Sequence, residues 1–484
     1  AADSSESNIV ASNKELIADD GTDDSLNGDI QPDKLPEPTI TPAGTTETEF
    51  TEYSELQLVR KSSVTSATTN LLNGSLLREG WPIQLDAWVG CGGGCTAAIS
   101  NQPTTAFVNN DGNKEILVGY TLPNYPYGRV GIYQHNGTVL NGWPRETYGW
   151  PQNGVSVADL DNDGFNEVIT STHLGNIYVW KNNGDPLWVR TLSNGVAFCL
   201  SIADLDNDKR KEIIVGSKNY IWVYDHEGNI KSGWPISISN YSVSCPAIGN
   251  LDADPFKEIV VTYYTGSSSP NPTAFVAVLE NSGEFKWVKD FREFYYQAGY
   301  HSASSPAIGD INNDKKLDIV AVADSGIANA KCVTVALHND GLTFSGWPKV
   351  SNSWCLDPSS PALADLNGDN HLEIIFGDRK ATGGSLYIWN ESGQNYGGFP
   401  INPFPNNPWS YVTSPTVYNV QSNSITSSII SVGGFGYSEN DEIFGKVFVY
   451  PVGSDLQNIS IDLENYPFGH NAPVLDDLDK DGRI

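Results

Sequence analysis

The sequence lacks several features that common protein classes require. It contains no methionine, has 28 Lys and Arg against 58 Asp and Glu, and has no apolar run of about 18 residues. No membrane-spanning helix is therefore expected. The net charge of −30 makes nucleic acid and anionic membrane surfaces poor partners, because their phosphates would be repelled. Hydrolase elbow, HExxH, P-loop and Rossmann motifs are absent, so no motif marks a catalytic centre.

The six cysteines form no C-x-x-C pair, which argues against a zinc ribbon or a thioredoxin-like site. Their even number fits disulfide bonds in an oxidising compartment. Cys199 and Cys245 each lie five residues before a repeated acidic loop, so a bridge between neighbouring repeats is expected there. The other candidate pairs are Cys91 with Cys95 and Cys332 with Cys355. Free buried thiols are the alternative.

Two further features favour a secreted or cell-surface protein. The chain begins Ala-Ala, as expected after removal of a signal peptide. Five N-x-S/T sequons are candidate glycosylation sites, although a chain rich in Asn, Ser and Thr contains some by chance. They lie at Asn73, Asn136, Asn240, Asn390 and Asn458.

The N-terminal segment differs in composition from the rest of the chain. Residues 1–50 hold twelve Asp or Glu, two Lys and no aromatic residue before Phe50. Such a segment buries too little apolar surface to fold alone. We therefore expect residues 1–52 to be an acidic tail or linker and residues 53–484 to form the folded part.

A repeat covers most of the chain and determines the expected fold. Its clearest copies are ADLDNDGFNEVIT (158–170), ADLDNDKRKEIIV (203–215), GNLDADPFKEIVV (249–261), GDINNDKKLDIVA (309–321) and ADLNGDNHLEIIF (364–376). Less regular copies occupy 107–118 and 418–430, and an eighth copy lies at 476–484. The copies recur every 45 to 60 residues.

Each unit contains about four strand-like segments with turns between them, as in a propeller blade. The expected fold is an all-β β-propeller of four-stranded blades, with eight blades. Seven blades with one peripheral unit is the alternative. We expect residues 53–83 to complete the eighth blade by pairing with the C-terminal unit, because this removes two open sheet edges. A third alternative is that the natural chain continues past residue 484.

The repeated loop reads Asp-x-Asp/Asn-x-Asp-x-x-x-Glu/Asp. Side chains at positions 1, 3 and 5 converge when the loop curls tightly, a carbonyl at position 7 joins them, and the acid at position 9 closes the shell. Oxygen ligands in this number favour Ca²⁺ over Mg²⁺ or Zn²⁺. An EF-hand is excluded, because it needs Glu at position 12, where Thr170 and Val215 stand. Asp/Asn-rich turns without metal are the alternative.

Five complete loops and the eighth one supply the expected calcium ligands, with position 7 acting through its backbone carbonyl. They are Asp159, Asp161, Asp163, Phe165 and Glu167; Asp204, Asp206, Asp208, Arg210 and Glu212; Asn250, Asp252, Asp254, Phe256 and Glu258; Asp310, Asn312, Asp314, Lys316 and Asp318; Asp365, Asn367, Asp369, His371 and Glu373; and Asp477, Asp479 and Asp481. The first loop has Phe107 at position 1, and the seventh loop (419–427) has no acid at any ligand position. No metal is expected in these two.

These units resemble FG-GAP/VCBS repeats, the calcium-loop blades of integrin α-subunit propellers and of many bacterial and archaeal surface proteins. The resemblance covers about residues 100–484. It implies a propeller with calcium on one face and a role in binding or adhesion, with a glycan or a protein as ligand. Similar blades occur in some polysaccharide lyases, which is a less favoured reading. Another alternative is a subunit of an extracellular filament or surface assembly that binds copies of itself through its tail.

A Gly-Trp-Pro sequence accompanies the repeat. It occurs at 80–82, 142–144, 149–151, 233–235 and 346–348, with Gly-Phe-Pro at 398–400. The aromatic ring would serve either as a platform for sugars or as a wedge between blades. Recurrence at a fixed place in the unit favours the wedge.

Overall fold

The computed structural model describes residues 102–463 together with Asp476 and Leu478. The gaps are 110, 123–125, 194–196, 266–271, 297–299, 301, 326–330, 353–358, 381–382, 404–410, 423–424, 438–442 and 453–458. Over this part the chain is almost entirely β-strand, and the helix it contains is a single turn, α1 (Phe291–Phe294). No helix there is long and apolar enough to cross a membrane.

Antiparallel sheets follow one another along the chain, and we call each group of strands that carries one copy of the repeat a blade. The first blade comprises β1 (Thr104–Ala106), β2 (Glu115–Thr121), β3 (Tyr127–Tyr133) and β4 (Arg145–Tyr148). The second comprises β5 (Pro151–Ala158), β6 (Glu167–Thr172), β7 (Asn176–Trp180) and β8 (Pro186–Thr191). In both, the strands pair in chain order.

The third and fourth blades belong to one seven-stranded sheet. The third blade comprises β9 (Ala197–Ala203), β10 (Glu212–Tyr224) and β11 (Ile236–Val243), and the fourth comprises β12 (Ala247–Gly249), β13 (Glu258–Tyr264), β14 (Ala274–Leu279) and β15 (Phe285–Asp290). Strand β11 pairs with both β10 and β13, which joins the two blades.

The remaining blades form separate sheets. The fifth comprises β16 (Ser302–Ala303), β17 (Ala307–Gly309), β18 (Asp318–Asp324), β19 (Cys332–Leu337) and β20 (Lys349–Ser351). The sixth comprises β21 (Ala362–Ala364), β22 (Glu373–Gly377) and β23 (Leu386–Trp389), and the seventh comprises β24 (Tyr411–Val412), β25 (Thr416–Ser422), β26 (Ile425–Tyr437), β27 (Ile443–Val452) and β28 (Ile459–Leu463).

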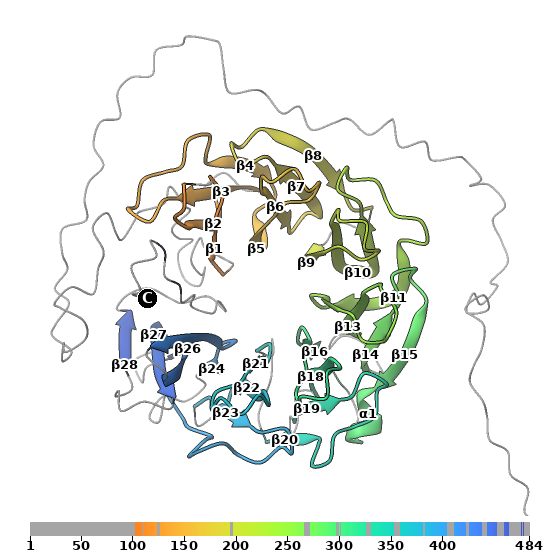
Figure 1. Cartoon of the computed structure of the whole chain (residues 1–484), viewed down its shortest axis with the longest axis vertical. Coiled ribbons are helices and arrows are strands. Elements are labelled where there is room, and N and C mark those ends of the chain that lie inside the picture. The colour runs from red at the N-terminus through yellow and green to blue at the C-terminus, as the bar shows by residue number, and fades with distance from the viewer. Residues whose placement is uncertain are drawn as a thin grey trace, which may run out of the picture. The chain divides into compact units, whose positions relative to one another are not determined.

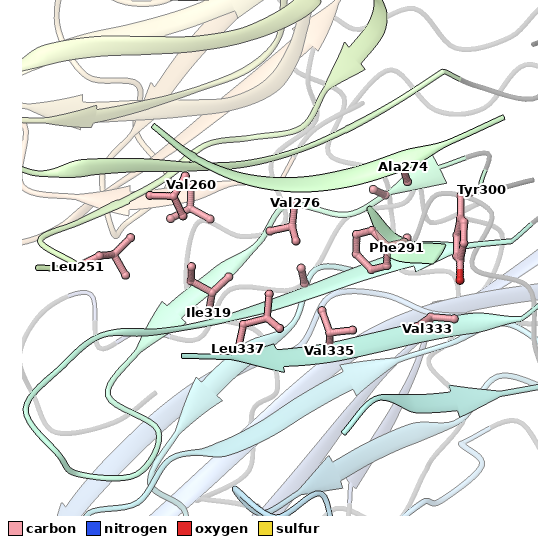
Figure 2. Close-up of a cluster of buried hydrophobic side chains, with 14 residues drawn as sticks. Leu251, Val260, Ala274, Val276, Phe291, Tyr300, Ile319, Val333, Val335 and Leu337 are labelled. Atoms are coloured by element: carbon pink, nitrogen blue, oxygen red, sulfur yellow. The ribbon is translucent and has the colours of Figure 1, made fainter. Parts of the chain in front are cut away.

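Apolar cores lie between successive blades rather than within one. The strand that follows each acidic loop is rich in β-branched residues and buried along its whole length in β6 and β18, because a blade covers each of its faces. One such core joins Val260 and Val276 of the fourth blade to Ile319 and Val335 of the fifth (Figure 2). Equivalent clusters occupy the other five seams between the seven blades.

Figure 1 shows the blades succeeding one another around a common centre, with first strands such as β1, β5, β9 and β21 toward that centre. The last described residues lie against the first blade. The backbone N–H of Lys114 donates to the carbonyl of Leu478 at 2.8 Å, and Asp476 accepts from Thr105 Oγ1 at 2.6 Å. The eighth copy of the repeat therefore begins beside the first blade.

The all-β expectation of blade-like antiparallel sheets is confirmed, although the number of strands varies. In the described part the third and sixth blades have three strands each, and the fifth and seventh have five. The expected tail (1–52) and the pairing of residues 53–83 with the C-terminal unit lie outside the described residues.

The expected bridge between Cys199 and Cys245 is confirmed, with a Cα–Cα distance of 5.2 Å. It joins β9 to the residue pair that precedes β12. Cys332 is also disulfide-bonded. Cys91, Cys95 and Cys355 lie outside the described residues.

The wedge interpretation of Gly-Trp-Pro is confirmed at three sites. The indole N–H groups of Trp143, Trp234 and Trp347 each donate across a seam to a carbonyl of the next blade, at 3.0, 3.2 and 2.8 Å. Gly346 has φ +89°, and a Cβ there would lie 2.2 Å from the carbonyl oxygen of Ser392, so the seam requires glycine. Trp150 differs, because its ring stacks on His173.

Candidate metal centre

The acidic loops lie between the first two strands of each blade, and left-handed backbone curls them tightly. In the second loop (159–167), Asn162 at position 4 has φ 64° and Gly164 at position 6 has φ 90°. The third (204–212), fifth (310–318) and sixth (365–373) loops also take positive φ at both positions. Asn, Gly and Lys hold these positions, and Asn and Gly tolerate this conformation best.

Each complete loop is stabilised by hydrogen bonds from its backbone N–H groups to its own carboxylates. In the second loop, Asp159 accepts from the backbone N–H of Asp163 at 3.1 Å and of Gly164 at 3.0 Å. The position 5 carboxylate accepts from the N–H of position 7 in all five complete loops, at 2.8–2.9 Å. These bonds run from Phe165, Arg210, Phe256, Lys316 and His371. Ligation by the position 7 carbonyl stays a prediction.

The acid at position 9 is buried, and besides its expected role as a metal ligand it bonds to the backbone of its own loop. One of its oxygens accepts from the backbone N–H of position 2 in six loops, at 2.5–3.1 Å. The six acids are Glu115, Glu167, Glu212, Glu258, Asp318 and Glu373, and none is more than 4% exposed. The other oxygen is then left to face the loop.

Three loops bring acidic oxygens within 4.8 Å of one another in the described part of the chain. The groups are Asp159 with Asp161 and Glu167; Asp204 with Asp206 and Glu212; and Asp252 with Asp254, Glu258 and Glu280. In the fourth loop (250–258), Glu258 Oε1 is buried without a hydrogen-bond partner. A buried carboxylate oxygen that lacks a donor beside further acids fits a hard cation, so the residues present suit Ca²⁺.

In these clusters, burial and neighbouring negative charges disfavour the ionised form of the acid at position 9. Burial, together with the neighbouring Asp161, Asp163 and Asp159, raises the pKa of Glu167 to about 7. Burial likewise raises the pKa of Glu258. Bound calcium would remove this penalty, because a dication favours the ionised carboxylates.

The fourth loop departs from the others at two linked positions. Position 1 is Asn250, whose Nδ2 donates to the carbonyl of Asp254 at 2.5 Å. Position 6 is Pro255, which has no backbone N–H to donate to a carboxylate at position 1 and does not adopt positive φ. Glu280, from the turn after β14, supplies the fourth acid of this cluster.

The fifth and sixth loops bring fewer acids together, because position 3 carries an amide. Asn312 Nδ2 donates to Asp314 at 3.2 Å, and Asn367 Nδ2 donates to Asp369 at 3.0 Å. His338 Nδ1 lies 3.3 Å from Asp318 in the fifth loop. Carboxylate and amide oxygens are still present at the expected positions.

The seventh repeat has a hairpin in place of a loop. Strands β25 and β26 stay paired up to Ser422 and Ile425, so Asn419 and Gln421 are strand residues. Nothing acidic is present there to curl the chain. In the first loop, Asp111 accepts from the N–H of Asn113 at 2.8 Å. Asp477, Asp479 and Asp481 of the eighth loop lie outside the described residues.

Three charged residues at the clusters were not identified from the loop motif. Lys231 Nζ lies 2.6 Å from Asp206 and 2.9 Å from Glu212. Lys286 pairs with Asp252 and, at 3.0 Å, with Glu280. All three come from the last hairpin of their blade, where the sequence signal for the two lysines is a Gly-x-x-Lys turn at 228–231 and 283–286.

A hollow of about 460 Å³ lies at the inner ends of the first three blades. It is lined by Thr104 and Thr105 of β1, by Ser156 of β5, and by the Cys199–Cys245 bridge. The described residues around it include hydroxyl and amide groups and no acid, histidine or lysine. These groups can form hydrogen bonds with a ligand.

Comparison with known proteins identifies the repeat. A family model described as FG-GAP-like repeat matches residues 159–215 and 310–376. The chain carries FG-GAP-like repeats. Both matched segments begin in an acidic loop, and each ends in the strand after the next loop of its kind.

Curated proteins gave no match. Similar solved structures include two crystal structures of BBS1N in complex with ARL6DN, soaked with mercury and with lead. Both are 13% identical and cover 79% of this chain and 99% of their own, with TM-scores of 0.42 and 0.43.

Proposed function

We propose that the chain is an extracellular β-propeller, stabilised by calcium in its FG-GAP-like loops, that acts in binding or adhesion at a cell surface. The main support is the recurrence of converging carboxylates in the first hairpin of successive blades. Acids this close repel one another unless a cation joins them. Oxygen donors alone favour calcium among the common metal ions.

An extracellular location is supported by the disulfide bond between Cys199 and Cys245, because such bonds persist in secreted and surface proteins. The blade number that we favour is eight. Asp476 and Leu478, at the start of the eighth repeat, bond to Thr105 and Lys114 of the first blade. An eighth blade would therefore lie between the seventh and the first.

The ligand that we favour is a glycan or a protein, and the net charge of −30 makes nucleic acid unfavourable. The loops at the two ends of the blades supply the binding surface, as is usual when a rigid β scaffold carries function. Calcium would fix the shape of the loops on one of these faces.

The calcium role is tested by thermal unfolding of the full chain in calcium, in magnesium and in EDTA. Calcium should raise the melting temperature and magnesium should raise it less, because a ligand bound only to the native state stabilises it by mass action. An identical melting curve in all three buffers would overturn the calcium role.

The binding role is tested on immobilised glycans and by sedimentation, each with calcium and with EDTA. Calcium-dependent capture of a glycan class supports binding, and calcium-dependent self-association identifies copies of the chain as the partner. Unsaturated products released from acidic polysaccharides would replace this proposal with a lyase activity.

A further inference from the structure

One position recurs in the last hairpin of each of the first six blades. Backbone bonds define it: Leu140, Lys231, Phe344 and Tyr396 each donate their N–H to the equivalent residue of the preceding strand, at 2.8–3.0 Å. Leu187 and Lys286 hold the matching place in the second and fourth blades, in the irregular step between paired residues. The position is therefore apolar or aromatic in four blades and lysine in two.

In the third blade this lysine bridges the loop carboxylates. Lys231 Nζ donates to Asp206 at 2.6 Å and to Glu212 at 2.9 Å. Both acids belong to the cluster of oxygens within 4.8 Å, together with Asp204. The ammonium group thus bonds to two of the three acids of this cluster.

In the fourth blade a lysine again bonds to the position 3 acid, and its second partner is Glu280 instead of the position 9 acid. Lys286 Nζ donates to Asp252 and, at 3.0 Å, to Glu280. Two neighbouring blades therefore place an ammonium group between two acids of the candidate metal cluster.

The second loop has an acidic cluster but no lysine at the hairpin position. Asp159, Asp161 and Glu167 form a cluster of the same size, and the hairpin position holds Leu187. Lys181, in the turn before it, is exposed. Among the described residues no cationic side chain pairs with the four acids of this loop, so their formal charge of −4 is uncompensated by protein.

We infer that Lys231 and Lys286 act as tethered counter-cations of the third and fourth loops, so that these two loops bind a divalent cation more weakly than the second loop. The inference rests on the proposed calcium role and deepens it by ranking the sites. A dication must displace the ammonium group from the carboxylates that it needs, because the two positive charges repel at this distance.

Calorimetric titration of calcium into the full chain tests this ranking. Lys231→Met should raise the affinity of one site by about tenfold, since the competing charge is gone while the stem is kept. Lys218→Met is the control, because it removes an exposed lysine of β10 and changes the net charge equally. Leu187→Lys should have the opposite effect and remove one ion from the tightest class.

Thermal unfolding gives a second readout. In EDTA, Lys231→Met should melt at a lower temperature than the wild type, and calcium should raise its melting temperature by more. If the wild type binds calcium and both Lys231→Met and Leu187→Lys give the same titration as the wild type, this inference alone is overturned. A wild type that binds no calcium overturns the proposed function as well.

Discussion

Glu115, the ninth residue of the first loop, performs the same backbone task as its counterparts in more acidic loops. Its Oε2 accepts from the N–H of Val108 at 2.8 Å, and the side chain is buried. Position 1 of this loop is Phe107, which offers no ligand. The hydrogen bond made by the ninth residue is therefore separable from metal binding.

Replacing Glu115 by Ala should lower the free energy of unfolding by about 1–3 kcal/mol, because the buried N–H of Val108 loses its acceptor. The loss should be equal in calcium and in EDTA, as measured by urea denaturation. Glu115→Gln keeps an acceptor and should lose less. A loss seen only in calcium would assign the residue to a metal site instead.

Glu167 should give the metal-free protein a pH dependence of its own. Its pKa is raised to about 7 from the ordinary 4.5, chiefly by burial. The folded state holds this proton more tightly than the unfolded chain. Its contribution to stability is therefore full below 4.5 and is lost as pH rises through about 7.

Glu167→Gln removes that titration. In EDTA, the melting temperature of the wild type minus that of the variant should fall between about pH 5 and about pH 7.5. Calcium should flatten the trend, because it binds the deprotonated carboxylate. A difference that is flat in EDTA would contradict the raised pKa.

At the scale of elements, the loop-bearing hairpin was predictable because its information is local. Acids at alternate positions, a following run such as Glu212–Gly216, and the turn residues all lie within one stretch of sequence. The contacts that complete the site were not predictable. Lys231 reaches Glu212 from 19 residues away, and Glu280 joins a loop that ends at Glu258.

Strand pairing shows the same limit. Four strands were expected for every blade, yet β11 pairs with β13 and joins two blades. Such pairing depends on where the end of one sheet meets the next, which no local pattern encodes. The wedge role of Gly-Trp-Pro, in contrast, followed from its recurrence.

Trp347 provides a test of the seam between the fifth and sixth blades. Trp347→Phe removes the bond from Nε1 to the carbonyl of Glu391 and keeps most of the ring contact with Trp389. The expected loss in free energy of unfolding is about 1 kcal/mol. Trp347→Ala also empties the seam and should cost about 3–5 kcal/mol, measured by chemical denaturation. Equal losses in the two variants would show that the ring does not contribute.

At the scale of the whole molecule, the start of the eighth repeat bonds to the first blade, far from it in sequence. Asp476 accepts from Lys114 Nζ at 2.7 Å and from Thr105 at 2.6 Å, and its side chain is 11% exposed. These bonds tie the start of the eighth repeat to β1 and to the loop that follows it.

Asp476→Ala should lower the free energy of unfolding by about 1–3 kcal/mol, because it removes charge-assisted bonds and leaves Lys114 without them. Hydrogen exchange should rise first in β1 and β2. Glu146→Ala, which removes an exposed pair with Arg129, is the control and should change stability by less than about 0.5 kcal/mol. An exchange pattern unchanged in the first blade would mean that the contact does not hold it.

The union of the third and fourth blades has a mechanical consequence. In the described part of the chain the other blades are separate sheets, joined by side-chain packing and by isolated hydrogen bonds such as that from Trp347 to Glu391. These two share a strand ladder, and a covalent bond closes the 46 residues from Cys199 to Cys245. Under a pulling force, the packed seams should peel apart first. The third and fourth blades would stay folded together under this load. Reduction of their disulfide bond would be needed to extend the chain fully.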